Sequence, residues 1–323
     1  MNQLQDNFDW SRNDGVPDLS NAIVILWNGF ELRSTALVRH ANATGANKVF
    51  ILKFSDSQFD LSENDKCLEQ QLDPRNTFRI DVDRGSQFRT YQTIRSQIAK
   101  SDPSLKIIFD ITCFPRDVLL LILYVLWSLS RLDQVICVYN VAQDYSTQQS
   151  EISEKWLSKG VSSVSPVIGY RGVLRPDRPL QVVGLVGFDD QRVTQIADIL
   201  SPSSLVFAHG DTHLKEREWL VSQSKDAVSM LLNRFDESRQ ETFICEDGQS
   251  VSAMLDRARA AKPDYNLVVV PMNNKISTLF AATYCLKHRD VQICYGGALI
   301  YNHSHYSKES DKFYHWTAFS ETA

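Results

Sequence analysis

Short apolar runs alternate with longer stretches of helical spacing through the first half of the chain. Apolar runs rich in β-branched residues predict strands, and apolar residues three or four positions apart predict helices. The predicted strands are 22–27, 48–54, 105–110 and 134–141, and the predicted helices are 34–45, 87–100 and 115–130. The polar stretch 55–80 is predicted as loop with some helix. Because the strands are apolar throughout, they are typical of a parallel sheet covered on both faces.

The same alternation begins again in the second half, after a connection rich in Ser, Gly and Pro. The predicted strands are 180–188, 204–210, 265–271 and 291–297, and the predicted helices are 189–200, 218–235, 250–262 and 275–288. Alternating strands and helices predict a second parallel sheet. The chain therefore divides into a polar leader (1–20), a first domain (21–148), a linker (149–179), a second domain (180–305) and a C-terminal tail (306–323).

Matching residues recur in the two halves at a nearly constant spacing of 156 to 161 positions. The pairs are Gly29/Gly187, Asp110/Pro271, Tyr139/Tyr295 and Tyr145/Tyr301. Several matches in the same order indicate an internal duplication. The predicted fold class is therefore α/β, a tandem duplication of two Rossmann-like parallel-sheet domains. The strands expected to be equivalent are 22–27 and 181–187, 105–110 and 266–271, and 135–139 and 291–295.

Composition and charge narrow the classes of function. The 323 residues carry a net charge of −5 and no run of Lys or Arg, which argues against bulk nucleic-acid binding but leaves room for a local cationic pocket. The six cysteines form no C-x-x-C pair and the first twenty residues are polar, so reduced thiols and a cytoplasmic location are expected. The longest apolar segment, 118–129, is shorter than the roughly 20 residues that span a bilayer, so no membrane segment is expected.

Candidate binding residues follow the predicted strands, where open parallel sheets hold their ligands. Arg33, Arg116, Arg192 and Lys275 supply cations that suit an anion resting on a helix N-terminus. Around them stand small, acidic, amide and aromatic candidates: Gly29, Glu31, Ser34, Asp110, Thr112, Asp144, Tyr145, Gly187, Asp189, Asn273, Asn274 and Tyr301. We expect the four cations to converge on one cleft between the two domains.

Each group also has a structural interpretation. Ser34 and Thr112 suit helix caps, Arg33 suits a solvated surface charge, and the tyrosines suit either base stacking or a domain interface. A dinucleotide fingerprint, a P-loop and a G-x-S-x-G elbow are missing from the sequence, so no cofactor and no Ser-His-Asp triad are expected. The histidines of H-x-D-x-H (His209, Asp211, His213) and of His303-Ser-His305 lack an evident fourth ligand, so no metal is expected.

The pattern D-x-T-x(3)-[KR] before a helix, formed by Asp110, Thr112 and Arg116, resembles the CARF-type sensor domains of CRISPR-associated proteins. Two fused copies resemble the SAVED domain, a pair of CARF-like units that senses cyclic oligonucleotides in anti-phage defence. The resemblance covers most of 21–305 and implies that Asp110, Thr112 and Arg116 bind the ligand, with Lys275 in the second copy.

Three functions follow from these observations. The first is a binding module that senses an anionic nucleotide-type ligand between two CARF-like domains and acts through a separate effector protein in prokaryotic antiviral defence. The second is a nucleotide hydrolase or ring-nuclease-like phosphodiesterase, with Asp110 or Asp144 at the nucleophile and Arg116 and Lys275 at the phosphate. The third is a structural subunit of a multi-protein complex. The sequence lacks a compelling pair of nucleophile and base, which favours binding.

Overall fold

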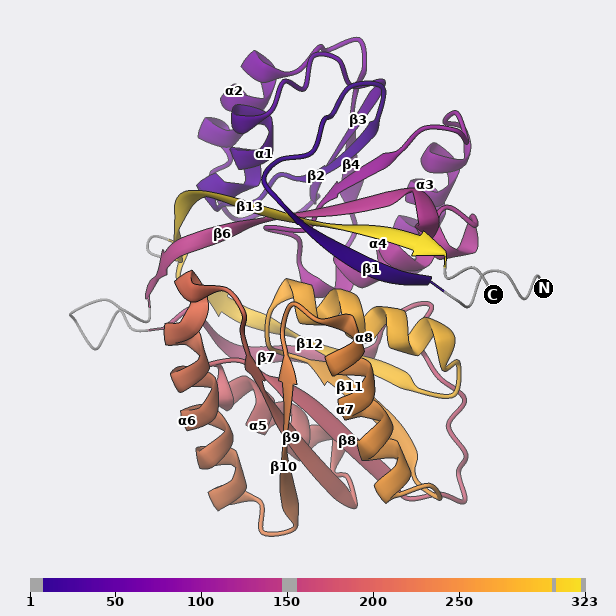
Figure 1. Ribbon diagram of the computed structural model, residues 1–323, viewed down its shortest axis with the longest axis vertical. Helices are drawn as coiled ribbons and strands as arrows, with labels where there is room; N and C mark the ends of the chain where they lie inside the picture. Colours follow the sequence, from indigo (N-terminus) through magenta and orange to yellow (C-terminus); the bar gives the residue numbers. More distant parts are fainter. Residues whose placement is uncertain (1–7, 147–155, 304–305, 321–323) are drawn as a thin grey trace. The chain divides into compact units, whose positions relative to one another are not determined.

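The computed structural model describes residues 8–146, 156–303 and 306–320 (Figure 1). The chain forms two compact units. Unit 1 consists of Met1–Trp156 and Asn302–Ala323, and unit 2 consists of Leu157–Tyr301. The final segment of the chain therefore returns to the unit in which the chain begins, and each unit is described by itself below.

A mixed sheet forms the centre of unit 1. Within the described residues its strand order is β1-β13-β6-β5-β2-β3-β4. Five strands run parallel: β2 (Ile23–Trp27), β3 (Lys48–Phe54), β4 (Thr77–Val82), β5 (Ile107–Asp110) and β6 (Val135–Tyr145). Two run antiparallel to their neighbours, β13 (Ser307–Ser320) beside β6 and β1 (Phe8–Asp14) beside β13. The continuous burial of β2 and β5 matches their apolar sequences and confirms that this sheet is covered on both faces.

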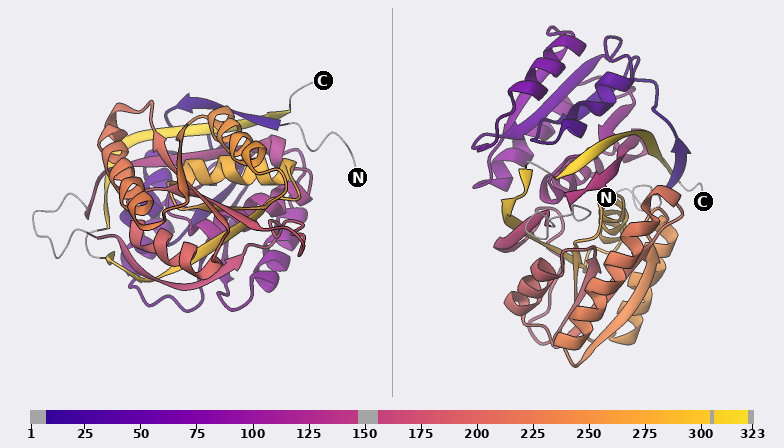
Figure 2. Two further views of the ribbon diagram at one scale, coloured as in Figure 1. Left: turned by 90° about the horizontal axis from the view of Figure 1, so that it is seen from below. Right: turned by 90° about the vertical axis from the view of Figure 1, so that its left-hand side faces the viewer.

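Helices connect the parallel strands of unit 1 and cover both faces of the sheet (Figure 2). They are α1 (Ala36–His40), α2 (Ser62–Gln71), α3 (Gln87–Ala99) and α4 (Arg116–Ser128), with short 3₁₀ turns at Leu32–Thr35 and Leu132–Gln134. Helix α3 is amphipathic, because its buried residues Thr90, Ile94 and Ile98 recur four positions apart. Helix α4 buries most of its apolar residues, so the longest apolar segment of the sequence is a core helix.

Unit 2 repeats this plan. Its sheet has the order β10-β9-β8-β11-β12-β7 in the part of the chain that the structure describes. The strands are β7 (Ser158–Pro166), β8 (Leu180–Val186), β9 (Ser204–Asp211), β10 (Ser238–Ile244), β11 (Asn266–Pro271) and β12 (Gln292–Tyr301). The helices are α5 (Asp190–Leu200), α6 (Glu218–Arg234), α7 (Gly248–Ala261) and α8 (Lys275–Lys287), with a 3₁₀ turn at Lys215–Arg217.

The strand orders of the two units are equivalent. The order β6-β5-β2-β3-β4 in unit 1 corresponds to the order β12-β11-β8-β9-β10 in unit 2, and the strands of each set run parallel. The same alternation of strands and helices along the chain builds both sheets. The three predicted strand pairs correspond to β2 and β8, β5 and β11, and β6 and β12. The predicted fold class, two duplicated Rossmann-like domains, is therefore confirmed.

Two edge strands of the sheets come from unexpected parts of the chain. Strand β7 directly follows β6 in the sequence but pairs antiparallel with β12, whereas β13 follows β12 but pairs antiparallel with β6. The antiparallel strand that follows the last parallel strand of one unit in the sequence thus belongs to the sheet of the other unit. We call this arrangement the strand exchange.

The strand exchange changes the predicted boundaries. The predicted tail 306–323 contains β13, whose residues Phe313, Trp316 and Ala318 are buried, and the predicted leader 1–20 contains β1. The predicted linker 149–179 contains β7. These strands lie at or next to sheet edges and carry many polar residues, so their sequences lack the apolar runs that mark the central strands.

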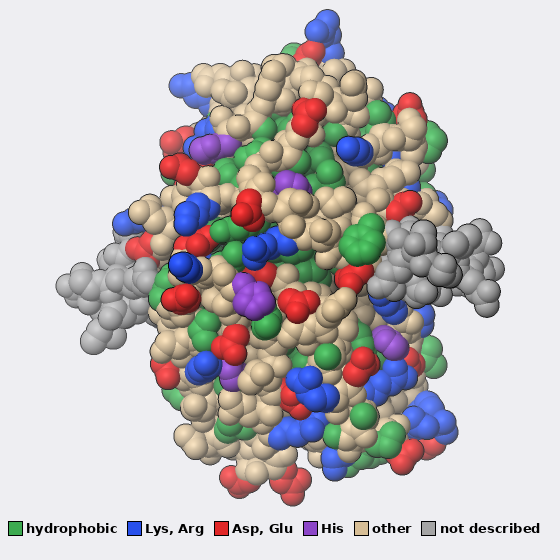
Figure 3. Space-filling model, viewed as in Figure 1, with side chains coloured by type: hydrophobic (Ala, Val, Ile, Leu, Met, Phe, Trp, Pro, Cys, Tyr) green, Lys and Arg blue, Asp and Glu red, His purple; other side chains and the backbone are tan. Residues whose placement is uncertain are grey.

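The surface of the molecule carries both signs of charge. On the face seen in Figure 3, Lys and Arg side chains are interspersed with Asp and Glu side chains. Among the described residues, no helix has both the length and the apolar character needed to cross a membrane.

Candidate functional site

Polar side chains gather at the carboxyl ends of the parallel strands in both units. In a Rossmann-like sheet this edge is where loops and helix N-termini meet and ligands bind. The predicted cleft between the two domains stays a prediction, and the candidate residues are described here unit by unit.

Arg33 of unit 1 is buried rather than open to a ligand. Its guanidinium donates hydrogen bonds to the Glu31 carboxylate (2.6 Å), the Ser307 hydroxyl (2.9 Å) and the main-chain oxygen of Asn140 (3.0 Å). Burial alone would lower the pKa of Arg33, but the charge of Glu31, with Tyr145 beside it, raises the pKa well above its ordinary value. Arg33 and Glu31 therefore form a permanent ion pair, and Arg33 ties the turn after β2 to β6 and β13. The expectation that Arg33 is solvated or faces a ligand is corrected.

Gly29 and Ser34 close the turn after β2. The Ser34 hydroxyl donates to the main-chain oxygen of Glu31 at 2.6 Å and accepts from the main-chain nitrogen of Gly29 at 3.3 Å. A Cβ atom at Gly29 would lie 2.7 Å from Nε1 of Trp27, so the turn has room only for glycine. Ser34 was expected as a helix cap, but α1 begins after Thr35 and Ser34 lies inside the preceding 3₁₀ turn.

Asp110 and Thr112 link the end of β5 to β6. Oδ1 of Asp110 accepts a hydrogen bond from the main-chain nitrogen of Thr112 (3.0 Å), and the Thr112 hydroxyl accepts one from the main-chain nitrogen of Asn140 (2.9 Å). Both side chains are buried. Helix α4 begins at Arg116 after Pro115 as its N-cap, so Thr112 is not the expected cap. Arg116, in contrast, is partly exposed at the first turn of α4.

Aromatic rings surround this edge of unit 1. The ring centroid of Phe30 lies 4.6 Å from that of Phe59 and 5.3 Å from that of Tyr306, and Tyr306 lies 6.5 Å from Tyr145. The exposed His303 adds a ring 5.6 Å from Phe59. The four aromatic residues are half-buried and come from the loops after β2 and β3, from the end of β6 and from the position just before β13. We call Phe30, Phe59, Tyr145 and Tyr306 the aromatic cluster; sequence analysis found only Tyr145.

Arg192 of unit 2 matches Arg33. Its guanidinium donates to the hydroxyl of Ser158, to the Asp189 carboxylate and to the main-chain oxygen of Gly296. Burial would lower the pKa of Arg192, but Tyr295 and Asp189 raise it above its ordinary value. Asp189 also caps α5 by accepting from the main-chain nitrogen of Arg192 at 3.2 Å. Arg192, which was predicted to bind a ligand, therefore belongs to a buried hydrogen-bond network.

The remaining candidates of unit 2 follow β11. Asn274 caps α8, since its Oδ1 accepts from the main-chain nitrogen of Ser277 (2.8 Å), and Lys275 is partly exposed as the first residue of that helix. Asn273 instead faces inward, with its Nδ2 donating to the main-chain oxygen of Val186 at 2.6 Å.

The last candidates lie at the ends of β6 and β12. Asp144 is within 4.0 Å of Lys308 Nζ, and Tyr301 pairs with Ser158 of β7. Asn302 donates from Nδ2 to the main-chain oxygen of Trp156 at 2.9 Å. These side chains therefore lie beside the exchanged strands rather than at the first turn of a helix.

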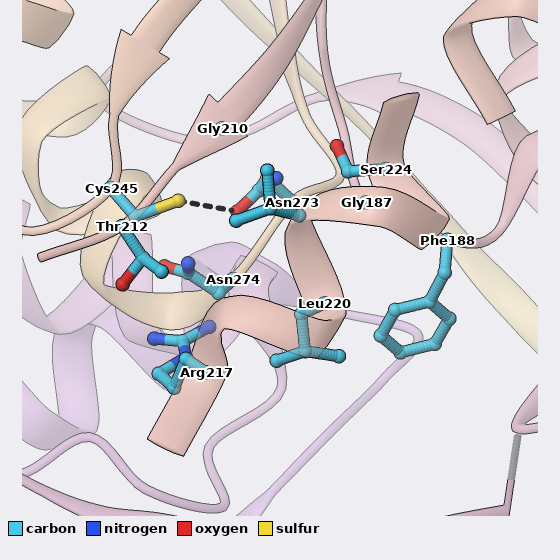
Figure 4. A pocket seen from close by; sticks show the side chains of 11 residues that line it. Gly187, Phe188, Gly210, Thr212, Arg217, Leu220, Ser224, Cys245, Asn273 and Asn274 are labelled. Atoms are coloured by element: carbon cyan, nitrogen blue, oxygen red, sulfur yellow. Dashed lines mark hydrogen bonds between the residues drawn. The ribbon is translucent and has the colours of Figure 1, made fainter. Parts of the chain in front are cut away.

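A small cavity of about 30 Å³ lies at the carboxyl ends of β8, β9, β10 and β11 (Figure 4). We call it the unit 2 pocket. It is lined by Gly187, Phe188, Gly210, Thr212, Arg217, Leu220, Val221, Ser224, Cys245, Asn273 and Asn274. Three of these, Gly187, Asn273 and Asn274, were predicted from the sequence. Cys245 was missed because β10, which ends just before it, carries charged residues and was not predicted as a strand, and the loop after β9 was considered only as a metal site.

A buried ion pair forms one wall of the unit 2 pocket. Nη1 of Arg217 lies 3.5 Å from Oε1 of Glu246, and both side chains are almost fully buried. Glu246 also accepts hydrogen bonds from the Thr212 hydroxyl (3.0 Å) and the main-chain nitrogen of His213 (3.2 Å). The pair and these hydrogen bonds thus tie the loop after β9 and the start of α6 to the loop after β10.

The histidine motif does not assemble a metal site. His209 is buried, with Nδ1 3.1 Å from Nε2 of Gln240 and Nε2 3.9 Å from Asp211, whereas His213 is exposed. In the described ranges, no group of three or more His, Cys, Asp or Glu side chains is placed to hold a metal ion. His305 of the second motif lies outside the described residues.

Thiols near these sites are poorly suited to nucleophilic chemistry. Burial raises the pKa of Cys245 to about 12, and burial likewise raises that of Cys294 to about 11. Because the thiolate is the reactive form, both groups are almost entirely protonated near neutral pH.

Comparison with known proteins gives no family. No protein-family model matches the chain, and no curated protein matches it. Among solved structures, the chain is similar to A-type ketoreductases from a modular polyketide synthase, with 9% identity over 87% of this chain and 79% of that chain and a TM-score of 0.24. An A1-type ketoreductase gives 8% identity, 89% and 80% coverage and a TM-score of 0.25. Similarity at this level carries no argument about activity.

Proposed function

We propose that the protein is a binding module for an anionic, nucleotide-type ligand, and that the carboxyl edge of unit 1 contributes the binding site. The observation that carries the proposal is the aromatic cluster, because it gathers half-buried rings from separate loops where a Rossmann-like sheet holds its ligand. Stacking on an aromatic ring is worth about 1–3 kcal/mol per base.

Arg116 supplies the charge in this proposal. It opens the 13-residue helix α4, whose N-terminus favours an anion, and it is partly exposed. Lys275 holds the equivalent place at the start of α8 in unit 2. Arg33 and Arg192 have a different role, since they are buried in pairs with acids.

Binding is favoured over catalysis by the chemistry of the described sites. Asp110 is buried and accepts a hydrogen bond from Thr112, and the thiols of Cys245 and Cys294 are held protonated. A ring-nuclease-like reaction would need an activated nucleophile. The action through a separate effector in antiviral defence rests on the resemblance to CARF and SAVED domains alone.

The test is a screen of mono-, di- and cyclic nucleotides by thermal shift, followed by calorimetry on any ligand that raises the melting temperature. Phe59→Ala and Arg116→Ala should each weaken binding about tenfold or more. Loss of stacking costs about 1–3 kcal/mol per base in the first variant, and loss of a hydrogen bond to a charged group costs about 1.5–3 kcal/mol in the second. Lys275→Ala tests whether unit 2 contributes to the same ligand.

The matched control is Arg95→Ala, which removes an exposed cation from α3. Binding that is equal in all variants would place the ligand elsewhere. A parallel loss of melting temperature and binding in Arg116→Ala would make Arg116 a structural residue, and a screen without any ligand would reject the proposed function.

A further inference from the structure

Strand β4 forms one edge of the unit 1 sheet, and part of its main chain points away from that sheet. The main-chain nitrogen of Ser55, just after β3, donates to the main-chain oxygen of Val82 at 3.1 Å, so Val82 faces β3. Because every second residue of a parallel strand faces the same neighbour, Arg79 and Asp81 direct their N–H and C=O groups outward. Among the described residues, these outward groups have no hydrogen-bond partner.

The other three sheet edges in the described part of the chain are blocked. In β1, the main-chain nitrogen of Trp10 donates to the carboxylate of Asp9 at 2.8 Å. In β10, the guanidinium of Arg257 donates to the main-chain oxygen of Thr242 at 3.3 Å. The pairing of β7 with β12 is interrupted by a register shift after Gly296. Bulges and charged side chains at an edge hinder pairing with a further strand, whereas β4 pairs with β3 in a regular register.

The side chains of β4 are accessible beside this edge. Phe78 is 40% exposed, the Arg79 side chain is 37% exposed, and Asp81 is exposed. An exposed aromatic ring next to outward main-chain groups is surface that a further strand would cover.

The sequence of β4 is self-complementary. From Phe78 to Val82 it alternates apolar, cationic, apolar, anionic and apolar residues, and this pattern is symmetrical about Ile80. In an antiparallel pair of two β4 strands centred on Ile80, Arg79 of each strand faces Asp81 of the other, and Phe78 faces Val82. Opposite charges and apolar side chains that face each other across strands stabilise a sheet by about 0.2–1 kcal/mol per pair. The same register aligns the outward groups of Arg79 and Asp81, so the two strands exchange main-chain hydrogen bonds.

The charges around the strand suit this register. Arg79 forms ion pairs with Asp65 and, at 3.5 Å, with Glu69, both from α2. Asp81 has Lys53 of β3 as its cross-strand neighbour. In the pair of β4 strands, each Asp81 therefore lies between a cation of its own chain and Arg79 of the second chain.

We infer that β4 is a dimerisation edge, at which two copies of this chain pair β4 with β4 in antiparallel orientation about Ile80 and join their unit 1 sheets. A two-fold pairing uses the same edge on both chains, so the assembly closes at the dimer. The inference uses no residue of the aromatic cluster and does not depend on the proposed nucleotide site.

The test is analytical ultracentrifugation of the full chain, without ligand, from about 1 to 300 µM. A single pair of short strands buries little surface, so we expect a reversible dimer with a dissociation constant of about 10–100 µM. Hydrogen exchange at the amides of Arg79 and Asp81 should slow about threefold or more between the two concentrations, because only the dimer protects them. A monomer at every concentration, or growth beyond a dimer, would overturn the inference.

Two variants locate the interface. Asp81→Pro removes an outward N–H and leaves the hydrogen bonds between β4 and β3 in place, and Asp81→Arg brings like charges face to face. Each should weaken dimerisation about tenfold or more, while the melting temperature stays within a few degrees of wild type. Glu237→Arg makes the same change of charge at an exposed position just before β10 and is the matched control, which should dimerise like wild type.

A dimer that both Asp81 variants leave unchanged would form through another surface, and this result would also overturn the inference. If Asp81→Pro does not fold, Asp81→Arg alone decides, because it changes only an exposed side chain. The proposed nucleotide site is tested by ligand binding, so its failure and the failure of the dimer are distinguishable.

Discussion

Arg33 donates a hydrogen bond from Nη1 to the main-chain oxygen of Asn140, 3.0 Å away, and so ties the turn after β2 to the last parallel strand of unit 1. Arg192 makes the equivalent contact with the main-chain oxygen of Gly296 in unit 2. Each arginine also binds an acid in its own turn and the serine that opens the exchanged strand, Ser307 or Ser158. The duplication has therefore kept a complete buried network as well as a strand order.

Replacing Arg33 or Arg192 by methionine should destabilise the protein strongly. Each change leaves Glu31 or Asp189 without its cationic partner in a largely buried site, and breaking such a pair typically costs about 3–5 kcal/mol. Urea denaturation measures the loss. The exposed Arg95→Met should change the free energy of unfolding by about 0.5 kcal/mol or less, and equal losses in all three would contradict the assigned network.

The strand exchange predicts an asymmetry between fragments. Residues 157–301 contain every strand of the unit 2 sheet among the described residues, so this fragment should fold alone with a cooperative thermal transition. Residues 1–156 lack β13 and leave the edge of β6 open, so they should aggregate or stay unfolded. Circular dichroism and light scattering distinguish these states. Adding a peptide of residues 302–323 should restore soluble unit 1, and cooperative folding of 1–156 by itself would contradict the prediction.

His209 should make stability depend on pH. Burial, with a smaller contribution from Lys225, lowers its pKa below 6.5, although Asp211 raises it. The unfolded chain therefore takes up a proton near pH 6.5 while the folded chain does not, so this contribution is present above pH 6.5 and is lost as the pH falls toward the folded pKa. The loss approaches about 1.4 kcal/mol per pH unit for one proton.

Unfolding free energies of wild type and His209→Gln between pH 7 and pH 5 test this dependence. The variant should show the shallower slope. Some slope should remain, because burial also lowers the pKa of His288. Identical slopes would mean that His209 takes up its proton equally in the folded and the unfolded protein.

Gly210 and Cys245 should be energetically coupled. A Cβ atom at residue 210 would lie 2.3 Å from Sγ of Cys245, so Gly210→Ala should cost about 1–3 kcal/mol through overpacking. Removing the sulfur in Gly210→Ala/Cys245→Ala should recover part of this cost, as a double-mutant cycle by urea denaturation will show. Additive costs would mean that the backbone moves instead.

Central strands and strand-end residues were predictable from the sequence, whereas edges and partners were not. The apolar runs at β2, β5 and β8 mark buried strands because both faces of each are covered. Strands β4, β10 and β13 carry polar residues at the sheet edges or next to them, and their sequences resemble loops. The guanidinium of Arg33 was predicted at the correct sheet edge, but its partner Ser307 lies 274 residues away, and no local pattern indicates such a contact.

The strand exchange also sets an order of folding during synthesis. The whole of unit 2 leaves the ribosome once β12 has emerged, whereas unit 1, whose first strands are made much earlier, must wait for β13 near the end of the chain. While the chain between β6 and β13 is being made, β6 therefore carries an unpaired edge and Arg33 lacks the serine that completes its network. The nascent protein should finish its second unit before its first, and unit 1 is the part that needs protection from aggregation until the last strand arrives.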